Sequence, residues 1–234
     1  MLAASPTQRN RLLARLSQRD FQLLKAHLEP VVLKLRHDLE KPNRPIEDVY
    51  FMETGIASVV AVQSGEKRVE VGLIGCEGMS GSAVMLGNHR SPHSTYIQVE
   101  GEGQRIKSDK IRKAMEDSPS LRGVFLRYVQ AFMVQTAHTA IANARTKLDQ
   151  RLARWILMAH DRVASSTLPL THEFLSLMLG VRRAGVTETL HALSEQGLIR
   201  AGVGKITVLN RKGLERCAGV SYGVPEAEFR RLIG

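Results

Sequence analysis

Two adjacent arginines, Arg182 and Arg183, stand where the sequence predicts the start of a short amphipathic helix. Positive charges at a helix N-terminus oppose the helix dipole, at a cost of about 0.3–1 kcal/mol each when exposed. Helix stability therefore does not explain the pair, whereas binding of an external anion, such as the phosphate backbone of DNA, would. The alternative is an ordinary helical hairpin whose basic face is merely solvated.

The residues around the arginines have the pattern of a helix-turn-helix. Apolar residues at helical spacing predict a first helix that Thr171 can cap through its hydroxyl and that Gly180 can end in the left-handed conformation. A second helix over 182–196 places Thr187 and Glu188 on the same outward face as the two arginines. In a helix-turn-helix the second helix enters the DNA major groove by its N-terminal residues.

The segment that follows predicts a β-hairpin, with strands at 198–200 and 205–209 and a turn at 201–204. A hairpin placed directly after a recognition helix is a wing. Arg200 and Lys205 would then point towards the phosphates that flank the recognition site. This second basic element favours DNA binding over a solvated hairpin.

Charge and composition are consistent with a polyanionic partner. The chain has 234 residues and a net charge of +10. Residues 145–234 contain 14 Lys and Arg against 8 Asp and Glu, which leaves +6 there and +4 in the first 144 residues. A basic balance favours a polyanion without choosing between nucleic acid and a membrane surface. The excess is denser in the part that carries the helix-turn-helix.

Several classes of protein are disfavoured by what the sequence lacks. Cys76 and Cys217 are too few for a disulfide framework or a cluster-ligand set, and the eight histidines form no close metal-ligand pair. No apolar run reaches membrane-spanning length and no signal peptide is visible. No nucleophile–base set, paired carboxylates or phosphate-cradling loop indicates an enzyme. We expect a cytoplasmic protein without enzymatic activity, metal or membrane contact.

The N-terminal half predicts a β-roll. Residues 1–29 have helical spacing, and from residue 49 the apolar period becomes two, with turns at 53–55 and 64–67. Several short strands at such spacing indicate a compact barrel or double-sheet roll. A short helix over 109–116 would close it.

A long helix is predicted from Ser120 to about Arg145. One stripe along it follows the alternating spacing of four and three that is typical of a coiled-coil seam. This stripe consists of Leu121, Phe125, Tyr128, Phe132, Gln135, Thr139 and Ala142. It can pack against a second copy of the chain, against the chain's own roll, or, through adjacent faces, against both; of these we favour dimerisation.

A β-roll, a long helix and a winged helix-turn-helix in this order resemble the catabolite activator/Fnr (Crp/Fnr) superfamily of bacterial transcription regulators. Residues 69–81, 149–163 and 177–199 carry the resemblance. It implies an α+β fold with a cyclic-nucleotide-binding-like jelly roll over 1–118, a dimerisation helix over 119–145 and a DNA-binding domain over 146–234. It also implies a homodimer that binds a palindromic operator in double-stranded DNA, with RNA polymerase as a further candidate partner.

The resemblance assigns DNA contacts by position. Arg183 matches the family arginine that reaches guanine O6 and N7, and Thr171 and Arg182 match phosphate contacts. Ala184 and Glu188 stand where cyclic-AMP-binding members commonly have glutamate and arginine, so a different half-site is expected. Glu188 either accepts a hydrogen bond from a cytosine N4 or is a solvated residue that pairs with a nearby arginine.

The family effector site transfers poorly to this sequence. Glu77 matches the ribose partner, but His93, followed by Ser94, stands in the arginine position, and a neutral imidazole is a weak replacement for guanidinium on a phosphate. Arg90 and Thr136 complete the candidate effector pocket, and Glu77 can instead be a loop carboxylate that binds backbone N–H groups. We expect no cofactor and no cyclic nucleotide; the alternative function is a small-molecule receptor whose ligand gates DNA binding.

Overall fold

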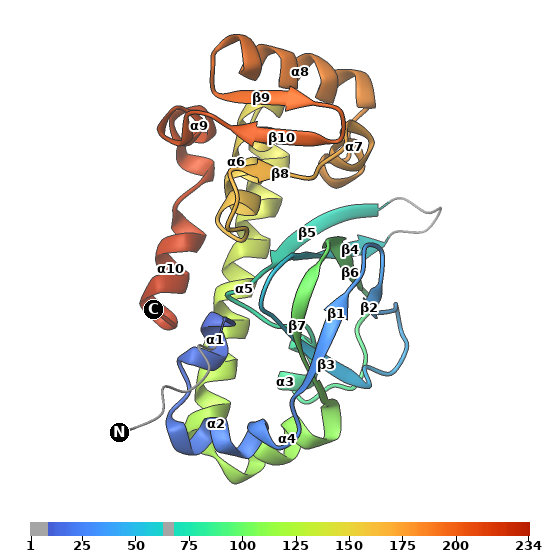
Figure 1. The fold of residues 1–234 in the computed structure, drawn as a ribbon, viewed down its shortest axis with the longest axis vertical. Helices are drawn as coiled ribbons and strands as arrows, with labels where there is room; N and C mark the ends of the chain where they lie inside the picture. The colour runs from blue at the N-terminus through green and yellow to red at the C-terminus, as the bar shows by residue number, and fades with distance from the viewer. Residues whose placement is uncertain (1–8, 63–67) are drawn as a thin grey trace.

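The computed structural model describes residues 9–62 and 68–234, and it places three parts along one long axis (Figure 1). A β-roll occupies the lower half, the helix α5 (Pro119–Arg145) runs along one side of it, and a smaller helical unit with its own sheet lies above. This arrangement confirms the expected α+β fold of roll, long helix and winged helix-turn-helix.

The β-roll consists of two antiparallel sheets. The first is ordered β1 (Glu29–Leu33), β7 (Gly101–Lys107), β3 (Asp48–Met52), and the second β2 (Asp38–Glu40), β6 (Ser94–Val99), β4 (Ile56–Val62), β5 (Arg68–Ile74). Helices α1 (Arg11–Ala14), α2 (Gln18–Lys25), α3 (Ser82–Met85) and α4 (Ser108–Asp117) belong to the same half of the molecule. The predicted turn at 64–67 and residues 1–8 of the predicted helical segment lie outside the described residues.

The upper unit contains the predicted helix-turn-helix and wing together with elements that the sequence did not predict. Its order is α6 (Leu148–His160), β8 (Thr167–Leu168), α7 (His172–Leu179), α8 (Arg183–Glu195), β9 (Ile199–Gly202), β10 (Lys205–Val208) and α9 (Arg211–Ala218). Strand β8 pairs with β10 and is too short to show a period of two. After a 3₁₀ turn at Gly219–Ser221, α10 (Val224–Leu232) descends beside α5 (Figure 1).

One apolar core joins the roll to the upper unit. Ile56, Val60 and Leu73 from the roll belong to the same buried cluster as Trp155 and Leu175 from the upper unit. Because apolar surface from both parts is removed from water together, separating them would expose it again. The upper unit is therefore docked on the roll rather than linked to it only through α5.

Two glycines, Gly72 and Gly78, allow α5 to pack closely against the roll. A Cβ added to Gly72 would lie 2.6 Å from Phe132 Cζ, and one added to Gly78 would collide with the hydroxyl of Tyr128. Both partners are on α5, so the end of β5 and the loop after it lie directly on that helix. No larger residue fits at either position without displacing an aromatic ring.

The predicted dimer seam on α5 requires correction. Of its seven residues, Leu121, Phe125, Tyr128, Gln135 and Ala142 are buried within a single chain, and Phe132 and Thr139 are half-buried. The five buried side chains fill the chain's own core, which is the alternative to a seam, so they are not available to a second copy.

Polar groups of the same stripe are also satisfied within the chain. The Gln135 amide accepts from Leu73 N at 2.7 Å and donates to Leu73 O at 3.3 Å, and the Tyr128 hydroxyl donates to Met79 O at 3.0 Å. A stripe at heptad spacing shows that a helix face is apolar, but not which surface covers it. Here the aromatic face of α5 covers the roll.

Gly78→Ala should destabilise the protein by about 1–3 kcal/mol, because overpacking a close-packed site displaces its neighbours and Tyr128 is buried. Gly123→Ala on α5 is the matched control, since its nearest neighbour would be Arg127 Nη1 at 3.5 Å. The control should stabilise the helix by about 0.5–1 kcal/mol. Urea unfolding of both variants tests the packing, and equal stability of the two would contradict it.

Candidate nucleic-acid interface

The turn between α7 and α8 has the local geometry that the sequence predicted. Thr171 Oγ1 accepts from Phe174 N at 3.1 Å at the start of α7, and Gly180, with φ of 63°, ends that helix in the left-handed region. Leu190 and Leu193 point into the core from α8 and are 1% exposed. Buried apolar residues therefore fix which face of α8 points outward.

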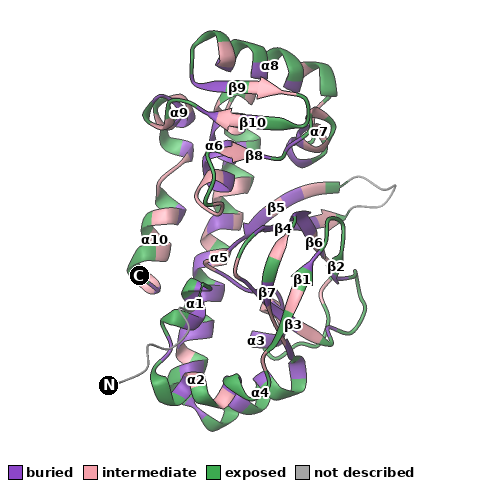
Figure 2. Ribbon diagram, viewed as in Figure 1, coloured by how far each residue is buried: buried purple, intermediate pink, exposed green. Residues whose placement is uncertain are grey.

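The outward face of α8 presents the predicted DNA-contacting residues to solvent (Figure 2). Arg182, Arg183, Thr187 and Glu188 are all exposed. Arg182 is the N-cap and its side chain makes no cap hydrogen bond, so the first backbone N–H groups of α8 remain open to an anion. Two guanidinium groups and a helix N-terminus thus converge on one exposed end.

Two of the predicted contacts differ in how free their side chains are. The hydroxyl of Thr187 donates to the Arg183 carbonyl at 3.1 Å and lies 2.9 Å from His172 Nδ1, so the fold already engages it. Glu188, by contrast, forms no ion pair with any residue in the described parts of the chain. Within residues 9–62 and 68–234, the suggested pairing of Glu188 with an arginine is therefore not seen.

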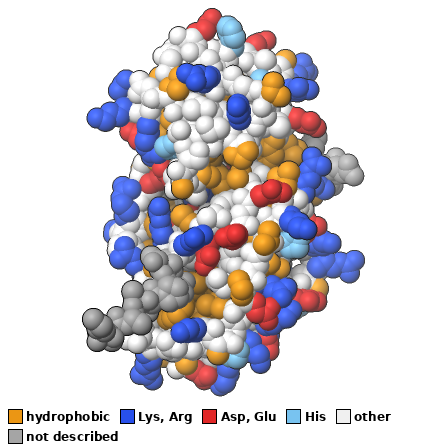
Figure 3. All heavy atoms as spheres, viewed as in Figure 1, with side chains coloured by type: hydrophobic (Ala, Val, Ile, Leu, Met, Phe, Trp, Pro, Cys, Tyr) orange, Lys and Arg blue, Asp and Glu red, His pale blue; other side chains and the backbone are white. Residues whose placement is uncertain are grey.

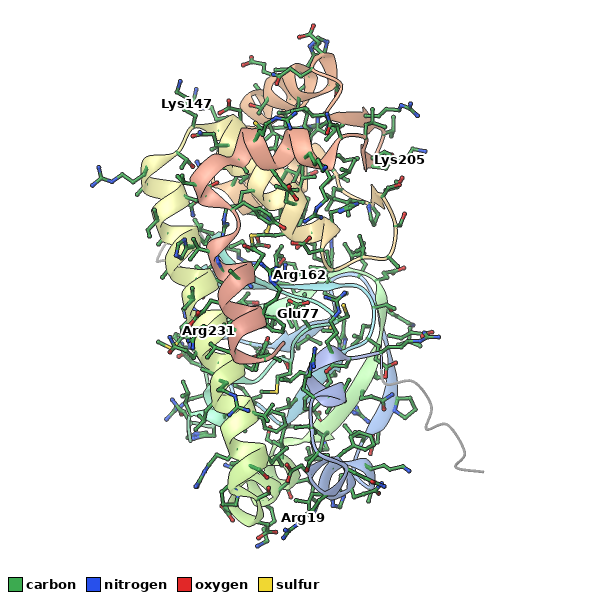
Figure 4. The ribbon with its side chains drawn as sticks, turned by 90° about the vertical axis from the view of Figure 1, so that its left-hand side faces the viewer. Arg19, Glu77, Lys147, Arg162, Lys205 and Arg231 are labelled. Carbon is green, nitrogen blue, oxygen red and sulfur yellow. The ribbon has the colours of Figure 1, made fainter. Side chains whose placement is uncertain are left out.

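The wing is a tight β-hairpin beside the recognition helix. A two-residue turn at 203–204 joins β9 to β10, so Ala201 and Gly202 belong to β9 rather than to the predicted turn. Arg200 and Lys205 are both exposed. Figure 4 shows Lys205 pointing away from the body of the upper unit. The structure thus provides a second basic surface next to α8.

Helix α6 supports the recognition elements from below. The ring of Trp155 packs edge-on against Phe174 of α7, with centroids 5.9 Å apart. Arg151 donates to the carbonyl of Leu179 at the end of α7, and buried Arg154 donates to Ser221 O at 2.9 Å. These contacts hold the upper unit against α6, which begins two residues after α5 and runs back alongside it.

A buried carboxyl group links this scaffold to the roll. Glu70 on β5 is 5% exposed and accepts from Ser58 Oγ at 2.6 Å and from Trp155 Nε1 at 2.5 Å. Burial raises the pKa of Glu70 to about 7, since the loss of water outweighs the two hydrogen bonds that favour the carboxylate. The contact between the roll and the upper unit thus includes a group that titrates near neutral pH.

The candidate effector residue Glu77 already has a partner in this chain. Its Oε1 lies 2.7 Å from Nε of Arg162, just beyond α6, and both side chains are largely buried. It also accepts from Gly75 N at 3.3 Å, in keeping with the alternative of a loop carboxylate bound by backbone N–H groups. Figure 4 shows the Glu77 and Arg162 side chains next to each other, beside α10.

The other four candidate effector residues do not join Glu77. Arg90 is exposed in a loop, and Ser94 lines a groove between the roll and α7. His93 is half-buried directly before β6, which begins at Ser94, and the hydroxyl of Thr136 donates to its own helix at 2.9 Å. Glu77 and Ser94 line two different cavities in this structure, and a shared pocket for all five residues stays a prediction.

The groove that Ser94 lines separates the roll from the helix-turn-helix. It has a volume of about 1010 Å³, and its walls include Tyr96 from the roll and Phe174 and Leu177 from α7. Figure 3 shows hydrophobic side chains exposed at this junction. Thr171 and Arg182 lie on the same groove, so two predicted phosphate contacts stand at the boundary with the roll.

Residues 9–62 and 68–234 contain neither a candidate metal cluster nor a candidate membrane-spanning helix. No group of three or more His, Cys, Asp or Glu side chains is arranged to hold a metal ion. None of the helices there is both long and apolar enough to cross a membrane.

Sequence comparisons match both the upper unit and most of the chain. A family model described as Crp-like helix-turn-helix domain matches residues 150–217. Transcriptional regulator SdrP of Thermus thermophilus is 23% identical over 177 residues, which cover 74% of this chain and 85% of that protein. Global nitrogen regulator of a Nostoc species is also 23% identical over 177 residues, covering 71% and 79%.

Solved structures with the same fold include FixK2 from Bradyrhizobium japonicum, with a TM-score of 0.70 at 16% identity over 82% of this chain and 98% of that one. A transcriptional regulator of the CRP family from Thermus thermophilus gives 0.68 at 18% identity, covering 81% and 96%. At such identities the likeness establishes the fold.

Glu70→Gln should change how stability depends on pH. The pKa of Glu70 rises from about 4.5 unfolded to about 7 folded, so the folded state binds the proton more tightly. This contribution to the free energy of unfolding is complete below the unfolded pKa and is lost as pH rises towards 7. The loss is a few kcal/mol, since one pKa unit corresponds to about 1.4 kcal/mol.

Urea unfolding between pH 4.5 and 8 measures this effect. Glu70→Gln keeps an acceptor for Trp155 but does not titrate, so its stability should fall less over this range than that of the wild type. Glu116→Gln, at an exposed position on α4, is the control and should follow the wild type. Parallel curves for Glu70→Gln and the wild type would contradict the assignment.

Proposed function

We propose that the chain is a member of the Crp/Fnr superfamily of transcription regulators, and that it acts as a homodimeric, sequence-specific DNA-binding regulator that reads a palindromic operator with α8. The observation that carries this proposal is the exposed arginine pair at the open N-terminus of α8, with a basic wing beside it. Arginines at a helix N-terminus reduce the stability of the helix, but together with the free backbone N–H groups they can bind the phosphate backbone of DNA.

Within this proposal each exposed residue has its own role. Arg183 reaches a guanine edge, where its planar fork can donate to O6 and N7 together. Arg182 and Thr171 contact phosphate at the start of the two helices, and Arg200 and Lys205 of the wing contact flanking phosphates. Thr187 and Glu188 lie further along the same face; the free carboxylate of Glu188 is the candidate acceptor for a cytosine N4.

The homodimer that we propose uses the exposed face of α5 rather than the buried stripe. Exposed residues with the same four-three alternation lie on this opposite face: Leu126, Gln130, Met133, Ala137, Ala140 and Ala144. Met133 and Ile141 are 56% and 54% exposed, and with Leu126 at 40% they leave several large apolar side chains uncovered on this helix. Small residues in the second half would allow two copies of α5 to approach closely.

A dimer along α5 would hold two copies of the recognition helix in a fixed relative position. Two recognition helices related by a two-fold axis can enter successive major grooves about 34 Å apart. Once one has bound, the second contact becomes intramolecular and the overall affinity rises. The division into a sensory roll (1–118), a dimerisation helix (119–145) and a DNA-binding domain (146–234) follows from this proposal, and RNA polymerase is then a candidate partner.

A small-molecule receptor function is the second candidate. It is favoured by the shared core, through which a change in the roll would reach the recognition elements. The split of the five family-based effector residues argues against a cyclic nucleotide at that position.

Arg183→Ala should cost about 1–3 kcal/mol on the cognate site and relax preference at one base position. Lys205→Ala should instead weaken binding to all sequences alike and reduce the salt slope by about one unit. The operator is first selected from a random DNA pool, and affinities are then measured by fluorescence anisotropy at several salt concentrations. Equal loss on cognate and random DNA for Arg183→Ala would assign it to phosphate.

The double variant Leu126→Glu with Met133→Glu should be a folded monomer. Burying carboxylates against their symmetry mates costs several kcal/mol per ion, whereas neither position is buried within the single chain. Light scattering measures the mass, and operator binding should weaken with it. Leu86→Glu, at an exposed residue outside α5, is the control and should remain a dimer.

A double variant that still dimerises would show that this face is not the interface. A folded monomer that binds the operator at wild-type affinity would show that DNA binding does not need the dimer.

A further inference from the structure

A cavity lies where the roll, α5, the upper unit and the C-terminal helix meet. It has a volume of about 340 Å³, within the range of small-molecule sites although near its lower end. Its walls include Glu77 from the roll, Tyr128 and Gln135 from α5, Arg162 from the segment just after α6 and Phe229 from α10. Because α10 forms one wall, the cavity depends on a helix beyond the matched helix-turn-helix region.

Arg162 is the buried charge of this cavity. Its side chain is 9% exposed, and only Nη1 makes a hydrogen bond, to Met158 O at 2.7 Å. Its Nε lies 2.7 Å from Glu77 Oε1, but the N–H is not directed along this line and has no hydrogen-bond partner. A buried guanidinium with unused donors is well suited to an anion, because such a group is costly to bury unsatisfied.

The backbone is shaped to admit this arginine. A Cβ added to Gly75 would lie 2.5 Å from Arg162 Cγ and 2.9 Å from Glu77 Oε2. The backbone N–H of Arg11 donates to Cys76 O at 2.7 Å, which places a second arginine beside the same loop. The cavity is therefore formed by specific close contacts of the chain.

The charges around the cavity leave cations in excess. Arg211 is fully engaged by Asp161, Glu215 and the Tyr222 hydroxyl. Of the remaining charged groups, Arg11, Arg162 and Arg230 face Glu77 and Glu226, which gives a net charge of +1. Neither Arg11 nor Arg230 forms an ion pair with a residue of the described chain that would compete with a ligand at the rim.

Aromatic side chains form the rest of the wall. Phe132, Tyr222 and Phe229 line the cavity from α5, the turn after α9 and α10. Such walls favour a ligand with a flat apolar part, whose burial removes apolar surface from water.

We propose that this cavity is a binding site for a small organic anion, one carboxylate or phosphate group joined to an apolar ring, with Arg162 binding the anionic group and Arg11 and Arg230 at its rim. The site is distinct from the five-residue effector pocket inferred from the sequence, of which it contains only Glu77. It is tested without DNA, so its outcome does not depend on the proposed DNA-binding function.

Isothermal titration calorimetry on the full chain tests the site with phenyl phosphate, benzoate, inorganic phosphate, cyclic AMP and benzylamine. Phenyl phosphate or benzoate should bind saturably and at least about tenfold more tightly than inorganic phosphate, a difference of about 1.4 kcal/mol. The tighter of the two identifies the anionic group. Benzylamine, which carries the opposite charge, and cyclic AMP should bind at least about tenfold more weakly than the better anion.

The double variant Arg11→Ala with Arg230→Ala should weaken binding of the better anion by at least about tenfold. Both residues are exposed, so the unfolding midpoint without ligand should stay unchanged. Arg19→Ala with Arg112→Ala removes the same charge from exposed positions outside the cavity and should bind as the wild type does. Arg162→Lys keeps the positive charge but loses the planar guanidinium. It should weaken binding of the better anion more than the Arg11 and Arg230 double variant does.

The proposal is overturned if neither aromatic anion binds saturably, if benzylamine binds as tightly as they do, or if the Arg11 and Arg230 variant binds as tightly as its control.

Discussion

The rest of the structure depends on one close approach. Helix α5 and the segment just after α6 pack directly on the end of β5 and the loop that follows it. Gly72 and Gly78 leave room for aromatic rings of α5, and Gly75 leaves room for the stem of Arg162. With side chains at these positions the long helix would stand away from the roll. The buried Glu70–Trp155 contact and the shared core could not then form, because both require the upper unit to lie directly on β5.

This close packing also places polar chemistry inside an apolar interface. Glu70 and Arg162 are both buried where the roll meets the upper unit, and each is only partly compensated by its partners. Buried ionisable groups add little net stability, but breaking their contacts is costly, so they favour one arrangement of the two parts over alternatives. The interface therefore favours one arrangement of the roll and the upper unit, and it contains a carboxyl group, Glu70, whose pKa is raised to about 7 by burial.

The sequence predicted the elements that have a strong local signature and missed those that depend on distant packing. Thr171, Gly180 and the apolar stripe of α8 define the helix-turn-helix through local capping and periodicity, and all three keep these roles in the structure. The two-residue β8 and the C-terminal α10 have no such signature, because pairing with β10 and packing on α5 specify them. Arg162 and Glu77 are 85 positions apart in the sequence, so sequence motifs could not predict that they form an ion pair.

The misplaced seam on α5 shows why periodicity alone does not identify an interface. Both faces of this helix follow the four-three alternation, one with aromatic residues and the other with aliphatic and small ones. Aromatic side chains bury more area each and fit the irregular surface of the roll around glycines, whereas a symmetric helix pair requires side chains that pack against their own copies. The small and aliphatic face is therefore the one suited to a second copy of the chain. Because α6 follows α5 after only two residues, the position of that face also determines where two recognition helices would stand relative to each other.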